Sequence, residues 1–277
     1  RTQPILNLAA FLPLPRWFPR FHRRATRRSA ALIRRLIAGL CEARAAQIAA
    51  GTAPDDLATK IMTTPDPQSG ELFTTAEMVD QVAIFFLAGH ETSASALAWA
   101  LYLLALHPQA QDRVAAEAAA FGDAPDFAAV SRLKFTRDVF RETLRLYPPV
   151  PMMVRQNLCP ESFRDRPVAP GAQIVLSPWH LHRHERIWRD PDDFDPDRWQ
   201  TEENRACARD AFIPFSAGPR VCTGAGFAMV EGPLLLAMLT RHFRFERTED
   251  PVPVAHLTVR AKDGIRLRLT RRAEAES

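Results

Sequence analysis

The sequence has few cysteines, and none of them form a closely spaced pair. Cys41, Cys159, Cys207 and Cys222 are far apart, with no C-x-x-C motif among them. Zinc ribbons and thioredoxin-type redox sites both need paired cysteines, so the sequence indicates neither class of site. Isolated thiols fit a reducing compartment, and we expect a cytoplasmic protein.

The sequence also lacks an uninterrupted apolar segment that could cross a bilayer. The longest hydrophobic stretch, residues 82–106, is broken by Gly-His-Glu-Thr-Ser at 89–93. An ionised glutamate is costly in a membrane, so we predict a buried helix here and no membrane contact. The chain starts at Arg1 without Met or a signal-like segment, so we expect further sequence upstream, where an anchor would be invisible.

Lysine is nearly absent, and arginine carries almost all of the positive charge behind the net charge of +4. Arginine pairs especially well with carboxylates and propionates. Residues 1–50 contain ten arginines and one acid, Glu42. A solvated helix face is the simplest interpretation, but phosphate, anionic lipid or an acidic protein would also suit it. We expect no nucleic acid as a partner. The arginines at helical spacing are Arg16, Arg20, Arg23, Arg24, Arg27 and Arg28.

The 277 residues, 47% of them hydrophobic, can bury the core of one large domain spanning residues 1–277. Periodicity and capping signals predict a mainly α fold with small β sheets. After an irregular proline-rich loop at 1–20, we expect a chain of helices followed by strands and irregular structure. The expected helices are 21–50, 55–63, 75–106, 109–121, 132–146 and 223–243. The expected strands are 152–156 and 173–177. Irregular structure is expected at 189–200 and in a long loop that ends at 222, and a hairpin is expected at 256–270.

Cys222 has surroundings that would activate its thiol. It lies in a loop between Gly218 and Gly224, directly before an apolar helical pattern. The free N–H groups at a helix start carry positive partial charge and stabilise a thiolate, which is a good ligand for iron. The glycines have no Cβ and allow a flat ligand to approach closely. An inert cysteine in a turn is the alternative.

A second unusual segment interrupts the predicted 75–106 helix. Residues 88–93 read Ala-Gly-His-Glu-Thr-Ser and place an acid and two hydroxyls within an apolar run. Gly89 costs about 1 kcal/mol relative to alanine in a helix, and Thr92 can bond the carbonyl of Ala88 and loosen the helix. Such a cost makes sense where a ligand needs room, although packing alone is the alternative.

A third pattern concerns charged residues. Glu142 and Arg145 are three residues apart on the predicted 132–146 helix, so they share a face and can form an ion pair. Taken together, the three patterns resemble the cytochrome P-450 family, in family order, from about residue 55 to the C-terminus. The chain resembles the C-terminal part of that fold, incomplete at the N-terminus. The family's haem-thiolate loop and following helix are matched over 212–243, at Phe215, Gly218, Arg220, Cys222 and Gly224.

The resemblance implies haem b as the cofactor, with Cys222 as the axial ligand of its iron. It implies that Arg220 and Arg155 pair with the haem propionates, and that the loop residues Phe215, Gly218 and Gly224 support the macrocycle. On the opposite side, Ala88 and Gly89 would leave room for oxygen. Thr92 would donate a hydrogen bond to the bound oxygen molecule, and Glu91 would relay protons from solvent.

The resemblance also implies a structural network in which Arg198, within Phe-Asp-Pro-Asp-Arg-Trp at 194–199, joins Glu142 and Arg145. Such a triad would lock the loop that leads to Cys222. The implied activity is a monooxygenase that inserts one atom of O2 into a small apolar organic substrate, with a ferredoxin or flavin reductase as the electron donor. A peroxide-using or isomerising haem-thiolate enzyme and a truncated, non-catalytic haem-binding fragment are the alternatives.

Two further features need an interpretation. His180, His182 and His184 alternate and could place metal ligands on one strand face, but the family segment that they resemble is structural. Pro233 follows Gly232 inside the predicted last helix, where a proline removes an N–H and is expected to cause a kink.

Overall fold

The computed structural model describes residues 24–67, 69–119, 130–255 and 257–272. The loop predicted for 1–20 and the arginines at positions 16, 20 and 23 lie outside these ranges. The chain divides into two compact units, residues 1–90 and 91–277. Helix α3 (Thr75–Leu106) supplies residues to both.

The first unit is built from α1 (Arg24–Ala49), α2 (Leu57–Thr63) and the beginning of α3. A small apolar core joins Ile37 and Cys41 of α1 to Met78 and Val79 of α3. Helix α3 starts with a capping box formed by Thr74 and Glu77. The Thr74 backbone N–H donates to the Glu77 carboxylate at 2.9 Å, while the Glu77 N–H donates to Thr74 Oγ1 at 3.3 Å.

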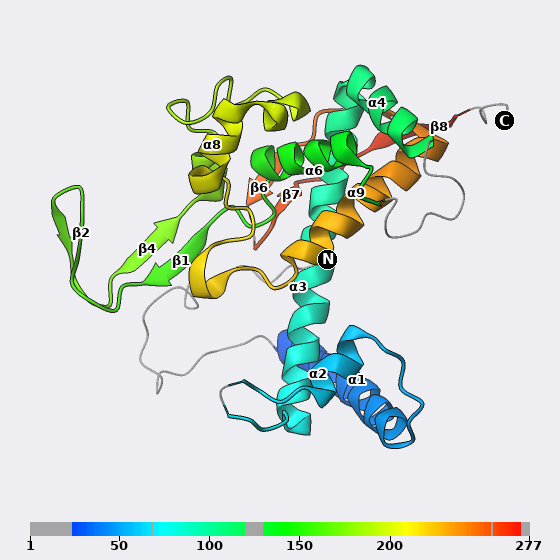
Figure 1. Cartoon of the computed structure of the whole chain (residues 1–277), viewed down its shortest axis with the longest axis vertical. Coiled ribbons are helices and arrows are strands. Elements are labelled where there is room, and N and C mark those ends of the chain that lie inside the picture. The colour runs from blue at the N-terminus through cyan, green and yellow to red at the C-terminus, as the bar shows by residue number, and fades with distance from the viewer. Residues whose placement is uncertain (1–23, 68, 120–129, 256, 273–277) are drawn as a thin grey trace. The chain divides into compact units, whose positions relative to one another are not determined.

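The second unit has a helical core in which α4 (Pro108–Ala119), α6 (Lys134–Leu146) and α9 (Ala225–His242) lie against one another (Figure 1). Val114, Val139 and Leu236, one from each helix, are fully buried in one cluster. Because α6 and α9 approach closely, only glycine fits at position 232. A Cβ there would lie 2.3 Å from the Phe140 ring. Helix α9 continues past Pro233 and ends at His242.

Short helices connect this core to the rest of the unit. They are α7 (Pro178–Leu181), α8 (Glu202–Ala211) and the 3-10 helices η2 (Pro196–Gln200) and η3 (Gly218–Arg220). The long loop predicted up to residue 222 is therefore wrong over α8. The missed signal is the cap, because Thr201 Oγ1 accepts from the Asn204 N–H and two glutamates follow in the first turn.

Four two-stranded antiparallel sheets are present among the described residues of this unit. The hairpin predicted for 256–270 is wrong, because its two halves pair with different partners. One half pairs with a strand that precedes it, and the other with the strand that follows α9. Alternation of side chains identifies a strand, but not its partner. The pairs are β1 (Met153–Gln156) with β4 (Gln173–Leu176), β2 (Glu161–Phe163) with β3 (Arg166–Val168), β5 (Phe243–Arg247) with β8 (Leu267–Arg271), and β6 (Pro253–Ala255) with β7 (Val259–Ala261).

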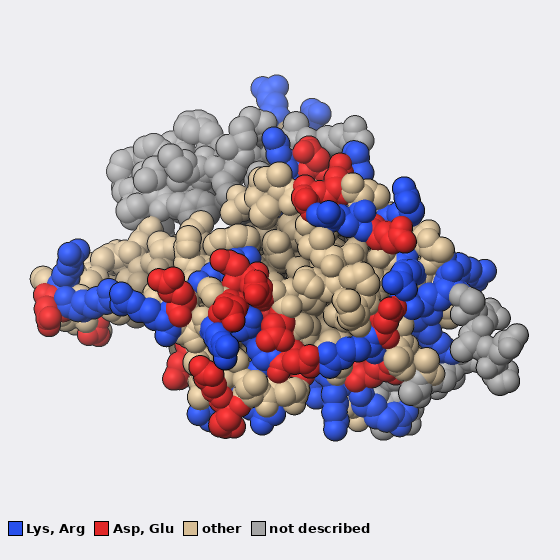
Figure 2. Space-filling model, turned by 90° about the horizontal axis from the view of Figure 1, so that it is seen from above, with Lys and Arg blue, Asp and Glu red and all other residues tan. Residues whose placement is uncertain are grey.

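Charged side chains of both signs share the surface. On the face seen in Figure 2, acidic and basic side chains lie next to one another across the middle of the view. Surface charges also form pairs, as in the exposed bidentate contact between Arg113 and Asp197. Within the described ranges, no helix is both long and apolar enough to cross a membrane.

Candidate active site

The loop that carries Cys222 is closed by its own backbone. The Cys222 N–H donates to the Phe215 carbonyl at 2.8 Å, and the Val221 N–H donates to the Gly218 carbonyl at 3.0 Å. Gly218 has a φ of +68°, which a residue with a Cβ rarely adopts. The loop therefore presents an exposed Cys222 thiol immediately before α9 begins.

Arg155 ties the neighbouring sheet to this loop. Its Nη2 donates to Ser216 Oγ at 2.6 Å, and its Nη1 donates to the Val154 carbonyl at 3.1 Å. Arg155, one of the two residues predicted to anchor haem, therefore contacts the loop. Arg220, the other predicted anchor, is an exposed residue at the end of η3.

The predicted ion-pair network is present and buried. Arg145 Nη2 lies 2.8 Å from Glu142 Oε1, and Arg198 Nε lies 2.9 Å from the same oxygen. Glu142 and Arg145 are fully buried, and Arg198 is 3% exposed. The guanidinium groups also donate to backbone carbonyls at Arg189, Pro191 and Asp193, so both charges are satisfied by hydrogen bonds. The network holds residues 189–198 against α6.

His182 links this network to the segment that leads to the cysteine loop. Its buried ring lies between two backbone groups, because Nε2 accepts from the Ile213 N–H at 3.0 Å and Nδ1 is 3.3 Å from the Arg145 carbonyl. The first contact requires an unprotonated Nε2, so Nδ1 carries the hydrogen. Desolvation lowers the pKa of His182 to about 4. Both nitrogens serve the fold, which agrees with the structural interpretation of this segment.

His182 should make the protein less stable in mild acid. As the pH falls below about 6.5, the unfolded chain takes up a proton at His182, while the folded protein does so only near its lowered pKa of about 4. The free energy of unfolding should therefore fall through this window, by about 2 kcal/mol between pH 7 and pH 5 from this residue. Urea unfolding at the two pH values measures the difference.

The matched control for this prediction is His180, an exposed residue of α7, the short helix that His182 follows as C-cap. His182→Gln should remove about 2 kcal/mol of the difference between the two pH values, although it lowers stability at both. His180→Gln should leave the difference unchanged. An unaltered pH dependence in His182→Gln would contradict the assignment.

The predicted oxygen motif lies in the middle of α3. Ala88 and Gly89 are exposed residues at the end of the first unit, whereas Glu91 and Thr92 are half-buried and begin the second. The Glu91 carboxylate accepts hydrogen bonds from Thr258 Oγ1 at 2.5 Å and from Arg260 Nε at 3.0 Å. The predicted proton-relay acid is thus held by a strand that comes late in the sequence.

The surroundings of Cys222 fit a large, flat and mainly apolar group bound through the thiol. Two large hydrophobic residues close to Cys222 in the sequence, Val221 and Phe227, are 54% and 69% exposed. A Cβ on Gly224 would lie 3.8 Å from Cys222 Sγ, an ordinary van der Waals contact, so the backbone next to the sulfur is not crowded. Covering such side chains gains about 1.5–3 kcal/mol each, which favours an apolar macrocycle at this face.

Comparison with known proteins decides which family this arrangement represents. The family model described as Cytochrome P450 matches residues 2–268. The chain belongs to the cytochrome P450 family. Thiolate-ligated haem b is the cofactor of this family, as the sequence motifs predict.

Relatives and solved structures agree with this family. The chain is 37% identical over 208 residues to cytochrome P450 4X1 of Mus musculus, covering 73% of this chain and 41% of that protein. It is 36% identical over 200 residues to cyclooctat-9-en-7-ol 5-monooxygenase of Streptomyces melanosporofaciens, covering 72% of this chain and 43% of that protein. The crystal structure of the cytochrome P450DA heme domain matches with a TM-score of 0.80 and 32% identity, over 88% of this chain and 54% of that one.

These proportions show that the chain spans about two fifths of the length of the curated relatives it matches. The cytochrome P450 fold is therefore present in part. The part that is present includes the cysteine loop, the buried network and helix α3. The sequence motifs located these three features.

Several contacts of the site were not foreseen from the sequence. Ser216, the partner of Arg155, has no signal beyond its place beside Phe215 in the loop. Arg260 lies on β7 and Thr258 directly precedes it; the alternation of this strand is readable, but the sequence does not show that the two residues meet α3. Tertiary contacts between distant segments create these roles.

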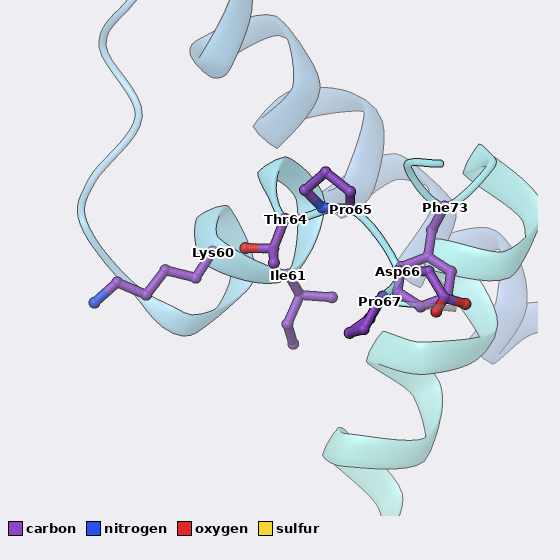
Figure 3. Close-up of a pocket in the computed structure, with 7 residues that line it drawn as sticks. All are labelled: Lys60, Ile61, Thr64, Pro65, Asp66, Pro67 and Phe73. Carbon is purple, nitrogen blue, oxygen red and sulfur yellow. The ribbon is translucent and has the colours of Figure 1, made fainter. Parts of the chain in front are cut away.

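A surface pocket of about 620 Å³ lies in the first unit, beside α2. Figure 3 shows Lys60 and Asp66 extending away from each other on either side of it. Lys60 instead pairs with Asp55, 3.3 Å from its carboxylate. None of the residues predicted to bind haem or oxygen lines this pocket, which is formed by Lys60, Ile61, Thr64, Pro65, Asp66, Pro67 and Phe73. The described residues also contain no cluster of three or more His, Cys, Asp or Glu side chains that suits a metal ion.

Proposed function

We propose that the protein to which this chain belongs is a haem-thiolate monooxygenase that inserts one atom of O2 into a small apolar organic substrate. The observation that carries the proposal is the exposed Cys222 thiol on a self-bonded loop at the start of α9. The relative from Streptomyces melanosporofaciens, which is named as a monooxygenase, supports the reaction class.

In this proposal Cys222 holds the haem iron, and Arg220 and Arg155 pair with the propionates. Bound there, the haem supplies the activation of O2, favoured by electron donation from the thiolate. The contact of Arg155 with Ser216 couples the anchor to the loop, so the arginine is already oriented before it meets a propionate. Phe215, Gly218 and Gly224 shape the loop around the sulfur.

The buried network has a supporting role in the same proposal. Glu142, Arg145 and Arg198 hold the 189–198 segment in place, and His182 connects it to Ile213. This arrangement positions the chain that runs into Phe215 and then Cys222. A ligand that must sit within a fraction of an ångström of its iron needs such support.

On the α3 side, we assign Thr92 and Glu91 to proton handling. The Thr92 hydroxyl can donate a hydrogen bond to bound oxygen, and Glu91 can pass protons from solvent. The small residues Ala88 and Gly89 leave room for the oxygen molecule beside the helix. We further propose a ferredoxin or flavin reductase as the electron donor and a cytoplasmic location. The four cysteines are all unpaired thiols, which supports a reducing compartment.

Isotope labelling tests the proposed reaction. With ¹⁸O2, a reductase and an apolar test substrate, the product should contain one ¹⁸O atom, and hydrogen peroxide should not replace O2 and the reductase. Thr92→Ala should lower the yield of product per O2 consumed by about tenfold or more, because the hydroxyl that donates the hydrogen bond is lost. Unlabelled product, or a wild-type protein that turns over with peroxide but not with O2 and the reductase, would overturn the proposal.

A further inference from the structure

The β6–β7 hairpin contacts three successive turns of α3. Ser95 Oγ donates to the Val259 carbonyl at 2.5 Å, and the Trp99 indole N–H donates to the same oxygen at 3.4 Å. One turn earlier, Glu91 accepts from Thr258 and Arg260. Residues four apart share a helix face, so the strand segment lies along one face of α3.

The three contacts differ in kind. Those of Ser95 and Trp99 end on a backbone carbonyl, and Val259 is 2% exposed, so they fix the strand itself. The contact of Glu91 is made by side chains alone. Arg260 Nη2 lies 2.5 Å from Glu91 Oε1, and Arg260 Nε donates to that oxygen as well. The position of the strand is therefore fixed, and Arg260 extends from this strand to bind the Glu91 carboxylate.

The ion pair is accessible to water. The side chains of Arg260 and Glu91 are 39% and 28% exposed. Partly exposed pairs of this type are weakened by solvent, so opening the pair costs little free energy. At the same time, two charge-assisted contacts to one oxygen restrict the directions in which the carboxylate can point. Arg260 therefore directs Glu91 and leaves it within reach of solvent.

We propose that Arg260 is a positioning residue that holds Glu91 where it takes up protons from water for the reaction. This inference rests on the proposed function, because it assigns a task within that reaction. A hydronium ion of the solvent gives its proton to the Glu91 carboxylate and becomes water. Glu91 then passes the proton to the Thr92 hydroxyl, which hands on its own proton for the reaction, and the carboxylate is regenerated. Thr258 supports the same oxygen with its hydroxyl, 2.5 Å away.

Arg260→Gln tests the role in the haem-loaded protein. The contacts to Val259 remain, so the hairpin should stay in place. Product formed per O2 consumed should fall roughly fivefold to tenfold, because a catalytic acid that is no longer directed loses much of its efficiency. The missing product should appear as hydrogen peroxide, with an increased solvent deuterium isotope effect. Arg260→Lys should restore most of the product ratio, since it retains a charge facing Glu91.

A double-mutant cycle supplies a readout that does not depend on activity. If the pair forms in solution, Glu91→Gln and Arg260→Gln should be non-additive in urea unfolding, by about threefold or more in the unfolding equilibrium constant. Arg266→Gln is the matched control, because Arg266 pairs with Glu249 at 3.7 Å on the exposed surface and should leave the product ratio unchanged.

The results separate the inference from the proposed function. A wild-type protein that makes no product would contradict the proposed function itself. An active wild type with an unchanged product ratio in Arg260→Gln would overturn the role of Arg260. Additive unfolding effects, or an equal loss of product in Arg260→Gln and Arg260→Lys, would likewise overturn it, since a purely structural arginine would behave in that way.

Discussion

Replacing Cys222 with serine is expected to abolish the red-shifted Soret absorption of the reduced, CO-treated protein. The shift reports a thiolate bound to the iron, and a serine hydroxyl cannot provide that ligand. The expected result is a complete loss of the shifted band and of product formation. The absorption spectrum of the reduced protein with CO is the measurement.

Cys159 provides the matched control, because its thiol is also exposed but lies between β1 and β2 rather than in the cysteine loop. Cys159→Ser should retain the shifted band at full intensity. A shifted band that persists in Cys222→Ser would show that another group binds the iron, and it would remove the basis of the proposed function.

Removing the charge of Glu142 is expected to be the most destabilising single change in the buried network. Glu142→Gln leaves two buried guanidinium groups, those of Arg145 and Arg198, without their shared carboxylate. Breaking one partner of a buried ion pair costs about 3–5 kcal/mol, because an uncompensated charge remains inside. Urea unfolding measures the loss, and haem content after purification should fall with it.

The control for this prediction is an ion pair of similar geometry on the surface. Asp197 is 58% exposed and accepts two hydrogen bonds from Arg113. Asp197→Asn should cost at most about 1 kcal/mol, since solvent screens exposed charges. Equal losses in Glu142→Gln and Asp197→Asn would contradict the view that burial makes the network important.

The helices were largely predictable because their signals are local. The 75–106 helix has the predicted bounds, since Thr74 and Glu77 mark its start and His107-Pro108 its end. The α8 helix was missed although Thr201 and the glutamates after it provide a start signal, because that segment has no strong apolar period. Within the described residues, the positions of the helices thus follow from neighbouring side chains.

The strands show the opposite case. Alternating residues indicate that 259–261 and 267–271 are strands, but the sequence suggests that they pair with each other, whereas each pairs with an earlier strand. Pairing depends on which segments the helices bring together, and a turn signal at Asp263-Gly264 does not decide it. The same limitation hid Arg260, whose partner lies 169 positions earlier.

The sequence by itself determined the family, the thiol that we propose as iron ligand and the charges of the buried network, because each depends on residue types at short, fixed spacings. Only the tertiary structure decided which distant side chains share a site: Arg155 with Ser216, His182 with Ile213, and Glu91 with Arg260. These pairings join segments between 31 and 169 positions apart. The physical reason is that spacing along a helix or loop places neighbours directly, whereas contacts across the chain arise only when buried helices and strands have packed.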